Sequence, residues 1–146
     1  MVLSNQFDSY RGSHKPDVDE VVRFHELDRA MPNFYETPHH YIHDHDGSDF
    51  YGAKEAKKSA SAARGNPDAD VRIYRAVPNN IETINPGDWV TTSNRYAEHH
   101  GQSNLPEGVG SHVLRATTKA KHIVFGGNDG YEFGYAGTEQ LPHDSR

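Results

Sequence analysis

Apolar residues recur at helical spacing near the start of the chain. A stripe of them runs between Asp17 and Pro32, made up of Val18, Val21, Val22 and Leu27. Glu20 lies three residues after Asp17, the spacing of a capping box, so we predict a helix that opens at Asp17 and ends at Pro32. The residues before it predict coil.

A second helix is predicted over residues 51–64, which are rich in Ala and Lys. Gly65 and Pro67 follow it and stop it. The sequence between the two predicted helices, residues 32–50, is rich in Pro, Asn, Asp, His and aromatic residues. It predicts a long loop, and long loops in compact domains tend to be functional.

The pattern changes to short strands after residue 70. Strands are predicted over 71–77, 88–92, 111–118, 122–125 and 131–135. Turn signals separate them, at Asn85-Pro86-Gly87 and Asn128-Asp129-Gly130, and a short helix over 94–100 is closed by Gly101. Helices followed by mostly strands indicate an α+β fold, with N-terminal helices packed on a split, mainly antiparallel β-core.

Composition limits the classes of protein that this chain can be. Its 146 residues fit one domain, residues 1–146, and only 34% are hydrophobic, so the core is expected to be modest. A net charge of −6 makes a nucleic-acid partner unfavourable. There is no apolar run for a membrane span and no secretory signal pattern, so we expect a cytoplasmic location. The absence of Cys excludes disulfides and thiolate catalysis.

Three polar positions are unusual for their predicted surroundings. Arg75 shares a strand face with Val71, Ile73 and Val77. It either extends its guanidinium past the strand end to water or grips a phosphate or carboxylate in a cleft. Thr91, Thr92 and Ser93 end a strand and open a helix. They are either ordinary helix caps or hydroxyls that orient a neighbouring acid.

Glu132 is the third of these positions. It alternates with the aromatic residues Tyr131, Phe133 and Tyr135, and Gly134 beside it leaves room. Its carboxylate therefore either acts as an acid in a cleft or faces solvent.

These residues, taken in chain order, resemble the R-S-E class of ADP-ribosyltransferases. The amino-acid sequence resembles even more closely the small ADP-ribosyltransferase domains of bacteriophage polyvalent proteins. The similar segments are GNPDADVRIYRAVP (65–78), INPGDWVTTSNRYAEHHG (84–101) and GNDGYEFGY (127–135). The resemblance covers residues 51–136. It leaves 1–50, the helix and His-rich loop, and 137–146, a tail, outside.

The resemblance implies an ADP-ribosyltransferase-like fold with a cleft for NAD, which is the substrate, and no required metal. Glu132 would be the catalytic acid, Ser93 would orient it, and Arg75 would hold the phosphate and ribose region. Ala76 would offer backbone groups to the nicotinamide carboxamide, and Thr91 and Thr92 would brace the site. Tyr96 or Phe133 would stack on nicotinamide.

The chemistry suits these residue types. Cleavage of the nicotinamide–ribose bond develops an oxocarbenium-like cation, which a carboxylate stabilises, and Arg binds a pyrophosphate in bidentate fashion. The expected activity is mono-ADP-ribosyl transfer from NAD to a macromolecular acceptor, a protein rather than a nucleic acid, or to water. The protein would be phage-encoded and act in the bacterial host cell.

One position departs from this pattern. Many arginine-modifying members carry Glu or Gln two residues before the catalytic Glu, where this chain has Gly130. This leaves three readings open: an acceptor other than arginine, plain NAD hydrolysis, or lost catalysis.

A His-rich loop, PHHYIHDHDGSD, offers a different chemistry. Its imidazoles could bind Zn²⁺ or Ni²⁺ together with the neighbouring carboxylates, although the spacing matches no closed zinc site. These residues are His39, His40, His43 and His45. The loop is otherwise a solvated acidic segment or a contact for the acceptor. The alternative to an enzyme is thus a non-catalytic module that binds a protein or a metal through this face.

Overall fold

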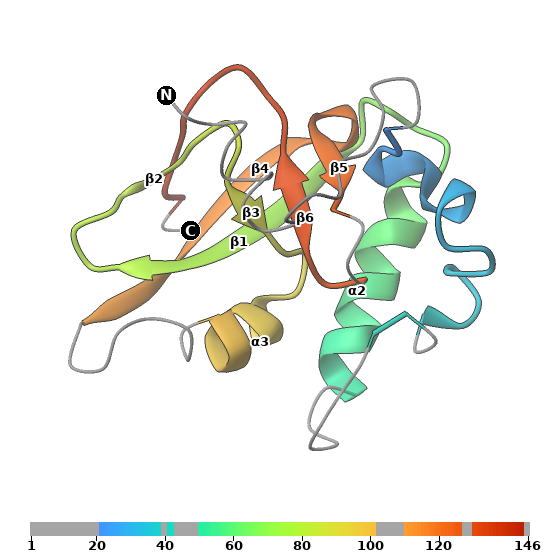
Figure 1. The fold of residues 1–146 in the computed structure, drawn as a ribbon, viewed down its shortest axis with the longest axis horizontal. Helices are drawn as coiled ribbons and strands as arrows, with labels where there is room; N and C mark the ends of the chain where they lie inside the picture. Colours follow the sequence, from blue (N-terminus) through green and yellow to red (C-terminus); the bar gives the residue numbers. More distant parts are fainter. Residues whose placement is uncertain (1–20, 39–40, 43–49, 102–109, 127–129, 145–146) are drawn as a thin grey trace, which may run out of the picture.

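The computed structural model describes residues 21–38, 41–42, 50–101, 110–126 and 130–144. Its elements in chain order are η2 (Phe24–Arg29), α2 (Phe50–Ala63), β1 (Asp70–Pro78), β2 (Thr83–Ile84), β3 (Trp89–Val90), α3 (Asn94–Tyr96), η4 (Ala97–Gly101), β4 (Ser111–Lys119), η6 (Ala120–His122), β5 (Ile123–Phe125), β6 (Phe133–Tyr135) and β7 (Leu141–Pro142). The fold is α+β, with few helices and small antiparallel sheets, as the sequence pattern predicts (Figure 1).

The described residues form three antiparallel sheets. The longest ladder joins β1 to β4, from the pair Asp70–Lys119 to the pair Pro78–Ser111. A second sheet has the strand order β3-β6-β5, and β2 pairs with β7. β1 meets β3 through one isolated bridge, in which Tyr74 and Thr91 exchange backbone hydrogen bonds of 2.8 and 2.9 Å. This bridge links the long ladder to the three-stranded sheet.

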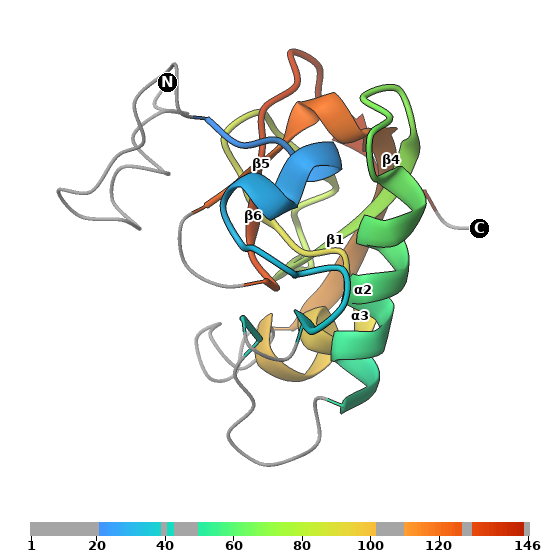
Figure 2. The same cartoon turned by 90° about the vertical axis from the view of Figure 1, so that its right-hand side faces the viewer.

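Helix α2 packs against the sheets through small residues. Ala56, Ala60 and Ala63 lie at helical spacing on one face and are at most 1% exposed. Small side chains let the helix approach its neighbours closely, and it contacts β1, η2 and α3. Figure 2 shows α2 running in front of the β-structure, with the N-terminal segment beside it. Gly65, with φ of 75°, ends the helix and donates its N–H to the carbonyl of His25 at 2.8 Å.

The first helix differs from its prediction. Asp17 and Glu20 lie outside the described residues, and residues 21–23 are extended, with Arg23 bridging Val124 of β5. A 3₁₀ helix begins only at Phe24, where Glu26 accepts the backbone N–H of Arg23 at 3.2 Å. The predicted helix is therefore wrong over residues 21–23. Pairing with a strand edge overrides the helical pattern there.

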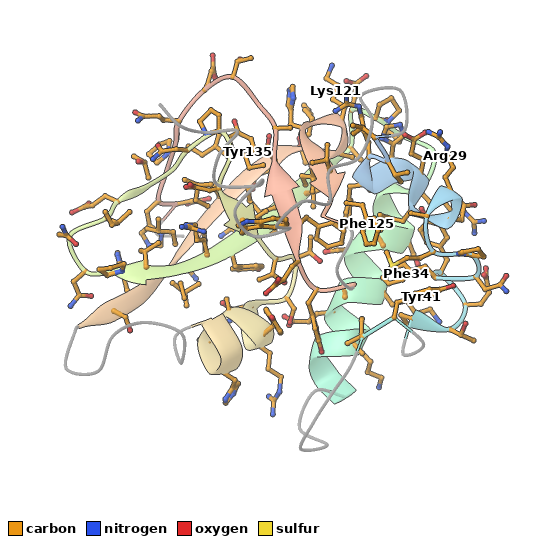
Figure 3. The ribbon with its side chains drawn as sticks, viewed as in Figure 1. Arg29, Phe34, Tyr41, Lys121, Phe125 and Tyr135 are labelled. Carbon is orange, nitrogen blue, oxygen red and sulfur yellow. The ribbon has the colours of Figure 1, made fainter. Side chains whose placement is uncertain are left out.

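The segment after η2 contributes to the core although it forms no long regular element. Phe34, Tyr35 and Ile42 are 1%, 4% and 5% exposed. Figure 3 shows Phe34 and Tyr41 beside α2, and their ring centroids are 6.2 Å apart. The loop prediction for residues 32–50 is confirmed for 32–38 and 41–42, whereas Phe50 already begins α2. The aromatic residues pack the described loop residues against the core.

The C-terminal residues are also part of the fold, which the sequence analysis missed. Leu141 pairs with Ile84, and Asp144 donates its N–H to the carbonyl of Arg115 at 2.7 Å. Asp144 also forms an ion pair with Arg72 at 2.8 Å. Strands of two residues carry too little periodicity to be recognised in a sequence.

Two buried tyrosine side chains make the free energy of unfolding depend on pH in the alkaline range. Burial raises the pKa of Tyr35 and of Tyr135, and the Leu27 N–H that the Tyr35 oxygen accepts lowers the pKa of Tyr35 by a smaller amount. A raised pKa contributes stability that is complete below the unfolded value, about 10, and is lost as the pH rises through the folded value.

We therefore expect the thermal midpoint to fall as the pH rises above about 10, where the unfolded phenols begin to lose their protons. The double variant Tyr35→Phe/Tyr135→Phe should show a smaller fall, because it has no phenol at either position. Circular dichroism melts from neutral to alkaline pH measure this. An equal fall in the double variant would contradict the assignment to these two residues.

Candidate functional site

Glu132 is held by an aromatic pair immediately before β6. The hydroxyl of Tyr96 donates to Glu132 Oε2 at 2.7 Å. The Tyr96 ring stacks on the ring of Tyr131, with centroids 4.3 Å apart and planes at 20°. Tyr131 is fully buried and Glu132 is half-buried. The predicted catalytic carboxylate thus has a defined position rather than an open solvent-facing one.

Ser93 is fully buried, but it does not contact Glu132 in the way that the resemblance implies. Its hydroxyl donates to Glu55 Oε1 at 2.8 Å and accepts the N–H of Tyr96 at 3.0 Å. A serine hydroxyl has one proton, and an ionised carboxylate only accepts, so that proton is committed to Glu55. That proton is therefore not available to Glu132, so any orientation of Glu132 by Ser93 is indirect. The two are connected through Tyr96.

Glu55 is the site residue that the sequence analysis missed. It lies on α2 and also accepts the N–H of Arg95 at 3.2 Å. Its position in a Lys- and Ala-rich helix resembles that of any solvent-facing carboxylate, so nothing in the sequence marks it. Glu55 has this role because α2 lies next to the start of α3 in the fold.

The anionic partner of Arg75 is Asp88, a residue of the protein itself. Its Nη1 donates to the carbonyl of Trp89 at 2.8 Å, and its Nε lies 3.6 Å from Asp88 Oδ2. The side chains of Arg75 and Asp88 are 26% and 10% exposed. The same carboxylate oxygen accepts the N–H of Asn85 at 2.8 Å, which ties the Asn85-Pro86-Gly87 turn to β1.

The backbone register places Arg75 in the row of Phe133, the residue that follows Glu132. Tyr74 pairs with Thr91, so Arg75 aligns with Val90, which pairs in turn with Phe133. Aligned residues of neighbouring strands share a face, so Arg75 points to the same side as two core residues. Phe133 is fully buried and packs edge-on against Phe24 at 5.2 Å, which rules out the predicted stacking of nicotinamide on its ring.

Ala76 lies on an edge of β1 that no strand covers in the described part of the chain. Tyr74 directs its N–H and C=O towards Thr91, and a strand repeats every two residues, so the backbone groups of Ala76 point the same way. In the described residues, the backbone hydrogen bonds between β1 and the β3 segment are those of the Tyr74–Thr91 bridge, and the guanidinium of Arg75 contacts the carbonyl of Trp89 beside it. A donor and an acceptor therefore stand side by side at an open edge, next to Arg75.

Thr91 and Thr92 are buried, at 4% and 3% exposure. Thr91 Oγ1 accepts the N–H of Ser93 at 3.2 Å and so shapes the strand–helix junction. Thr92 Oγ1 is a buried atom with no hydrogen-bond partner among the described residues. A buried hydroxyl without a partner costs free energy, so it marks a place where a polar ligand atom would be favoured.

Gly130 is packed against the segment that follows η2. Its N–H donates to the carbonyl of Tyr41 at 2.8 Å. A Cβ at this position would lie 2.8 Å from both Phe34 Cε1 and Ile42 Cγ1. The Glu or Gln of arginine-modifying enzymes does not fit here beside Phe34 and Ile42.

A cleft of about 520 Å³ opens between α2 and α3, beside the Ser93–Glu55 pair. Its lining is charged and polar and consists of Lys54, Glu55, Lys58, Asn94, Arg95 and Glu98. Cations outnumber carboxylates in this lining by three to two. The cleft thus gives solvent access to the carboxylate that holds Ser93.

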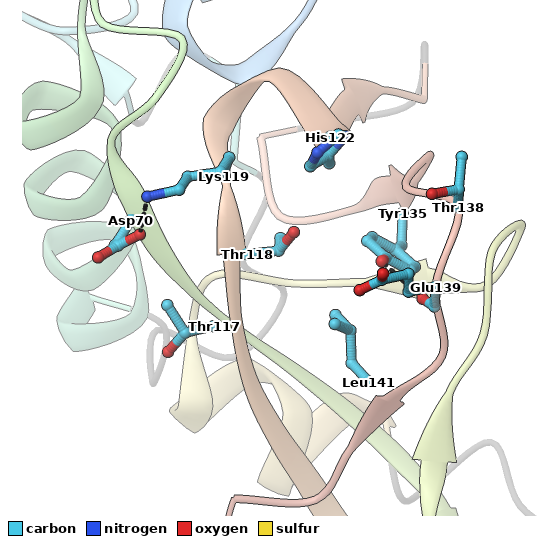
Figure 4. Close-up of a pocket in the computed structure, with 9 residues that line it drawn as sticks. All are labelled: Asp70, Thr117, Thr118, Lys119, His122, Tyr135, Thr138, Glu139 and Leu141. Carbon is cyan, nitrogen blue, oxygen red and sulfur yellow. Dashed lines mark hydrogen bonds and ion pairs between the residues drawn. The ribbon is translucent and has the colours of Figure 1, made fainter.

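A second cleft, of about 380 Å³, lies at the other end of the β1–β4 ladder (Figure 4). Its cation and its phenol are paired within the protein: Lys119 binds Asp70 at 2.8 Å, and Tyr135 donates to the carbonyl of Glu139 at 2.7 Å. None of the residues predicted as catalytic or NAD-binding lines it.

The predicted metal-binding alternative falls outside the described residues, since His39, His40, His43 and His45 are not among them. Within the described ranges, no group of three or more His, Asp or Glu side chains is arranged to hold a metal ion. None of the helices in those ranges combines the length and the apolar character that a membrane span needs.

Comparison with models of known protein families, with curated proteins and with solved structures finds no match for this chain.

Gly52 tests how tightly this site is packed. A Cβ there would lie 2.6 Å from the Tyr131 hydroxyl oxygen and 3.3 Å from Ser93 Oγ. We expect Gly52→Ala to lower the free energy of unfolding by about 1–3 kcal/mol from overpacking, offset by about 1 kcal/mol of helix propensity. Adding Tyr131→Phe should recover part of the loss, because it removes the phenol oxygen.

Chemical denaturation measures these changes. Ser61→Ala, at an exposed position of the same helix, is the control and should leave stability unchanged or raise it slightly. If Gly52→Ala and Tyr131→Phe change stability independently of each other, so that Tyr131→Phe recovers none of the loss, Tyr131 is not confined by α2.

Proposed function

We propose that this protein cleaves the nicotinamide–ribose bond of NAD and transfers ADP-ribose to a macromolecular acceptor, with NAD hydrolysis as the minimal reaction. The proposal rests on the resemblance to R-S-E ADP-ribosyltransferases together with the geometry around β1, β3 and β6. It includes an ADP-ribosyltransferase-like fold for the α+β domain. A protein acceptor fits the acidic chain better than a nucleic acid.

The observation that carries the proposal is the uncovered backbone edge at Ala76. A primary carboxamide such as that of nicotinamide has a donor and an acceptor in a fixed plane. The N–H and C=O of one extended residue are complementary to it. Such an edge is normally covered by another strand, and here the backbone pairing between β1 and the β3 segment in the described residues is limited to the Tyr74–Thr91 bridge.

Glu132 supplies the negative charge that the reaction needs. Loss of nicotinamide leaves positive charge on the ribose, and a fixed carboxylate stabilises it more in the transition state than in the ground state. The Tyr96 hydroxyl fixes that carboxylate at 2.7 Å without supplying a competing positive charge. The buried hydroxyl of Thr92, which has no hydrogen-bond partner among the described residues, would offer a further polar contact to a ligand.

Arg75 would act by exchanging partners. Its 3.6 Å contact with Asp88 is longer than a good charge-assisted hydrogen bond, so a pyrophosphate can replace that contact. The hydrogen bond to Trp89 would keep the guanidinium in place meanwhile. The same contacts also suit a purely structural arginine, which is the arrangement that a non-catalytic module would have.

Release of nicotinamide from NAD tests the reaction. The wild type should release it, and Glu132→Gln should lower the rate by at least about a hundredfold. The Gln side chain retains an oxygen for the Tyr96 hydroxyl, so the fold should persist. Glu139→Gln, an exposed carboxylate of the other cleft, is the matched control and should keep full activity. Equal rates for the two variants would refute Glu132 as the catalytic acid.

Calorimetric titration with NAD tests Arg75. Arg75→Ala should weaken binding by about tenfold to a hundredfold, the value of a lost hydrogen-bonded charge contact. Asp88→Asn in the same protein should restore stability, because it removes the unpaired carboxylate, but not affinity. Arg72→Ala, on the same strand and paired with Asp144, controls for general effects. An unchanged dissociation constant for Arg75→Ala would leave Arg75 a structural residue.

A further inference from the structure

The hydrogen bonds around Ser93 form one connected chain between α2 and β6. Glu55 accepts from the Ser93 hydroxyl at 2.8 Å, Ser93 Oγ accepts from Tyr96 N–H at 3.0 Å, and the Tyr96 hydroxyl donates to Glu132 at 2.7 Å. The chain begins and ends with a carboxylate. Its two inner members, Ser93 and Tyr96, open and close α3.

We propose that Glu132 is positioned by this relay, with Glu55 and Tyr96 as positioning residues that act through Ser93 and α3. The inference rests on the proposed function, in which Glu132 is the catalytic acid. It replaces the direct Ser93–Glu132 contact that the resemblance implies with an indirect connection. It also assigns a role to Glu55 that no sequence motif marks.

Glu55 fixes the start of α3. One oxygen of its carboxylate accepts both the Ser93 hydroxyl proton and the N–H of Arg95, at 2.8 and 3.2 Å. α3 has three residues and continues directly into η4, which has five, and an isolated helix shorter than about 12 residues is marginal in water. The direction of α3 is therefore set from outside, by a carboxylate anchored on the 14-residue helix α2.

Tyr131 fixes the ring of Tyr96 in the other direction. The two rings stack at 4.3 Å, and Tyr131 is fully buried against α2, where Gly52 leaves room for its hydroxyl. With its backbone tied to Ser93 and its ring held by Tyr131, Tyr96 has little freedom left. Its hydroxyl can therefore hold the Glu132 carboxylate at a defined place.

Steady-state nicotinamide release measures the role of Tyr96. Tyr96→Phe removes one oxygen and keeps the ring stack. It should lower kcat by about tenfold to a hundredfold, the effect of losing a hydrogen bond to a charged group, and leave the NAD dissociation constant unchanged. Tyr41→Phe also loses a phenol hydrogen bond, of 2.7 Å to the carbonyl of Pro32, and should keep the wild-type kcat.

Glu55 is tested with two substitutions. Glu55→Gln keeps an oxygen for Ser93 and Arg95 and should keep most of the activity. Glu55→Ala leaves both donors without an acceptor and should lower kcat in the same way as Tyr96→Phe, again without a change in NAD affinity. Loss of NAD binding in Glu55→Ala, or equal activity of the Gln and Ala variants, would overturn the role of Glu55.

A cycle with Glu132→Gln separates positioning from a general effect on folding. If Tyr96 acts through Glu132, Tyr96→Phe should cause no further loss of kcat in the Glu132→Gln background. An undiminished loss in that background would overturn the relay. A Tyr96→Phe variant with wild-type kcat would also overturn it, while the wild-type activity would leave the proposed function standing.

Denaturation of a second cycle, in which Glu132→Ala replaces Glu132→Gln, gives a readout without catalysis, because Ala leaves the Tyr96 hydroxyl without this acceptor. Coupling between Tyr96→Phe and Glu132→Ala in unfolding is the expected result, and its absence would overturn the contact itself. If the coupling is present but the wild type releases no nicotinamide, the proposed function fails. The hydrogen bonds of the relay then only stabilise the fold, and the proposed positioning role is refuted together with the proposed function.

Discussion

The bridge between Tyr74 and Thr91 is the contact on which the rest of the arrangement depends. It is one exchanged pair of hydrogen bonds, yet it joins the long β1–β4 ladder to the three-stranded sheet β3-β6-β5. It fixes the register that aligns Arg75 with Val90. It also determines which edge of β1 leaves the backbone of Ala76 uncovered. The chain enters α3 shortly after this bridge. Beyond this single residue pair, β1 and β3 are connected by the hydrogen bond from the Arg75 side chain to the carbonyl of Trp89.

The larger elements could be predicted from the sequence because their signals are local. The Ala-rich helix, the two long strands and the Asn85-Pro86-Gly87 turn all carry their own periodicity or turn residues, and the structure contains each of them. The first helix failed because an edge of β5 was available to Arg23. No local pattern reports which strand edge will be open elsewhere in the fold.

The candidate site shows the same division. Arg75, Ser93 and Glu132 could be chosen from residue type and chain order, but their contacts could not. Glu55 reaches Ser93 from 38 residues away in sequence, and the ring of Phe133 turns into the core with Phe24. Which polar side chains meet depends on tertiary packing, and packing depends on the whole chain.

The contact of Gly130 with Phe34 and Ile42 has a consequence for how this site can change. A side chain at position 130 would need space that the N-terminal segment now fills. Substitution there has to be accompanied by a smaller residue at position 34 or 42, about ninety residues earlier in the chain. The side chain at position 130 and the side chains at positions 34 and 42 are therefore coupled. A change at position 130 during evolution requires a compensating change at one of the other two positions.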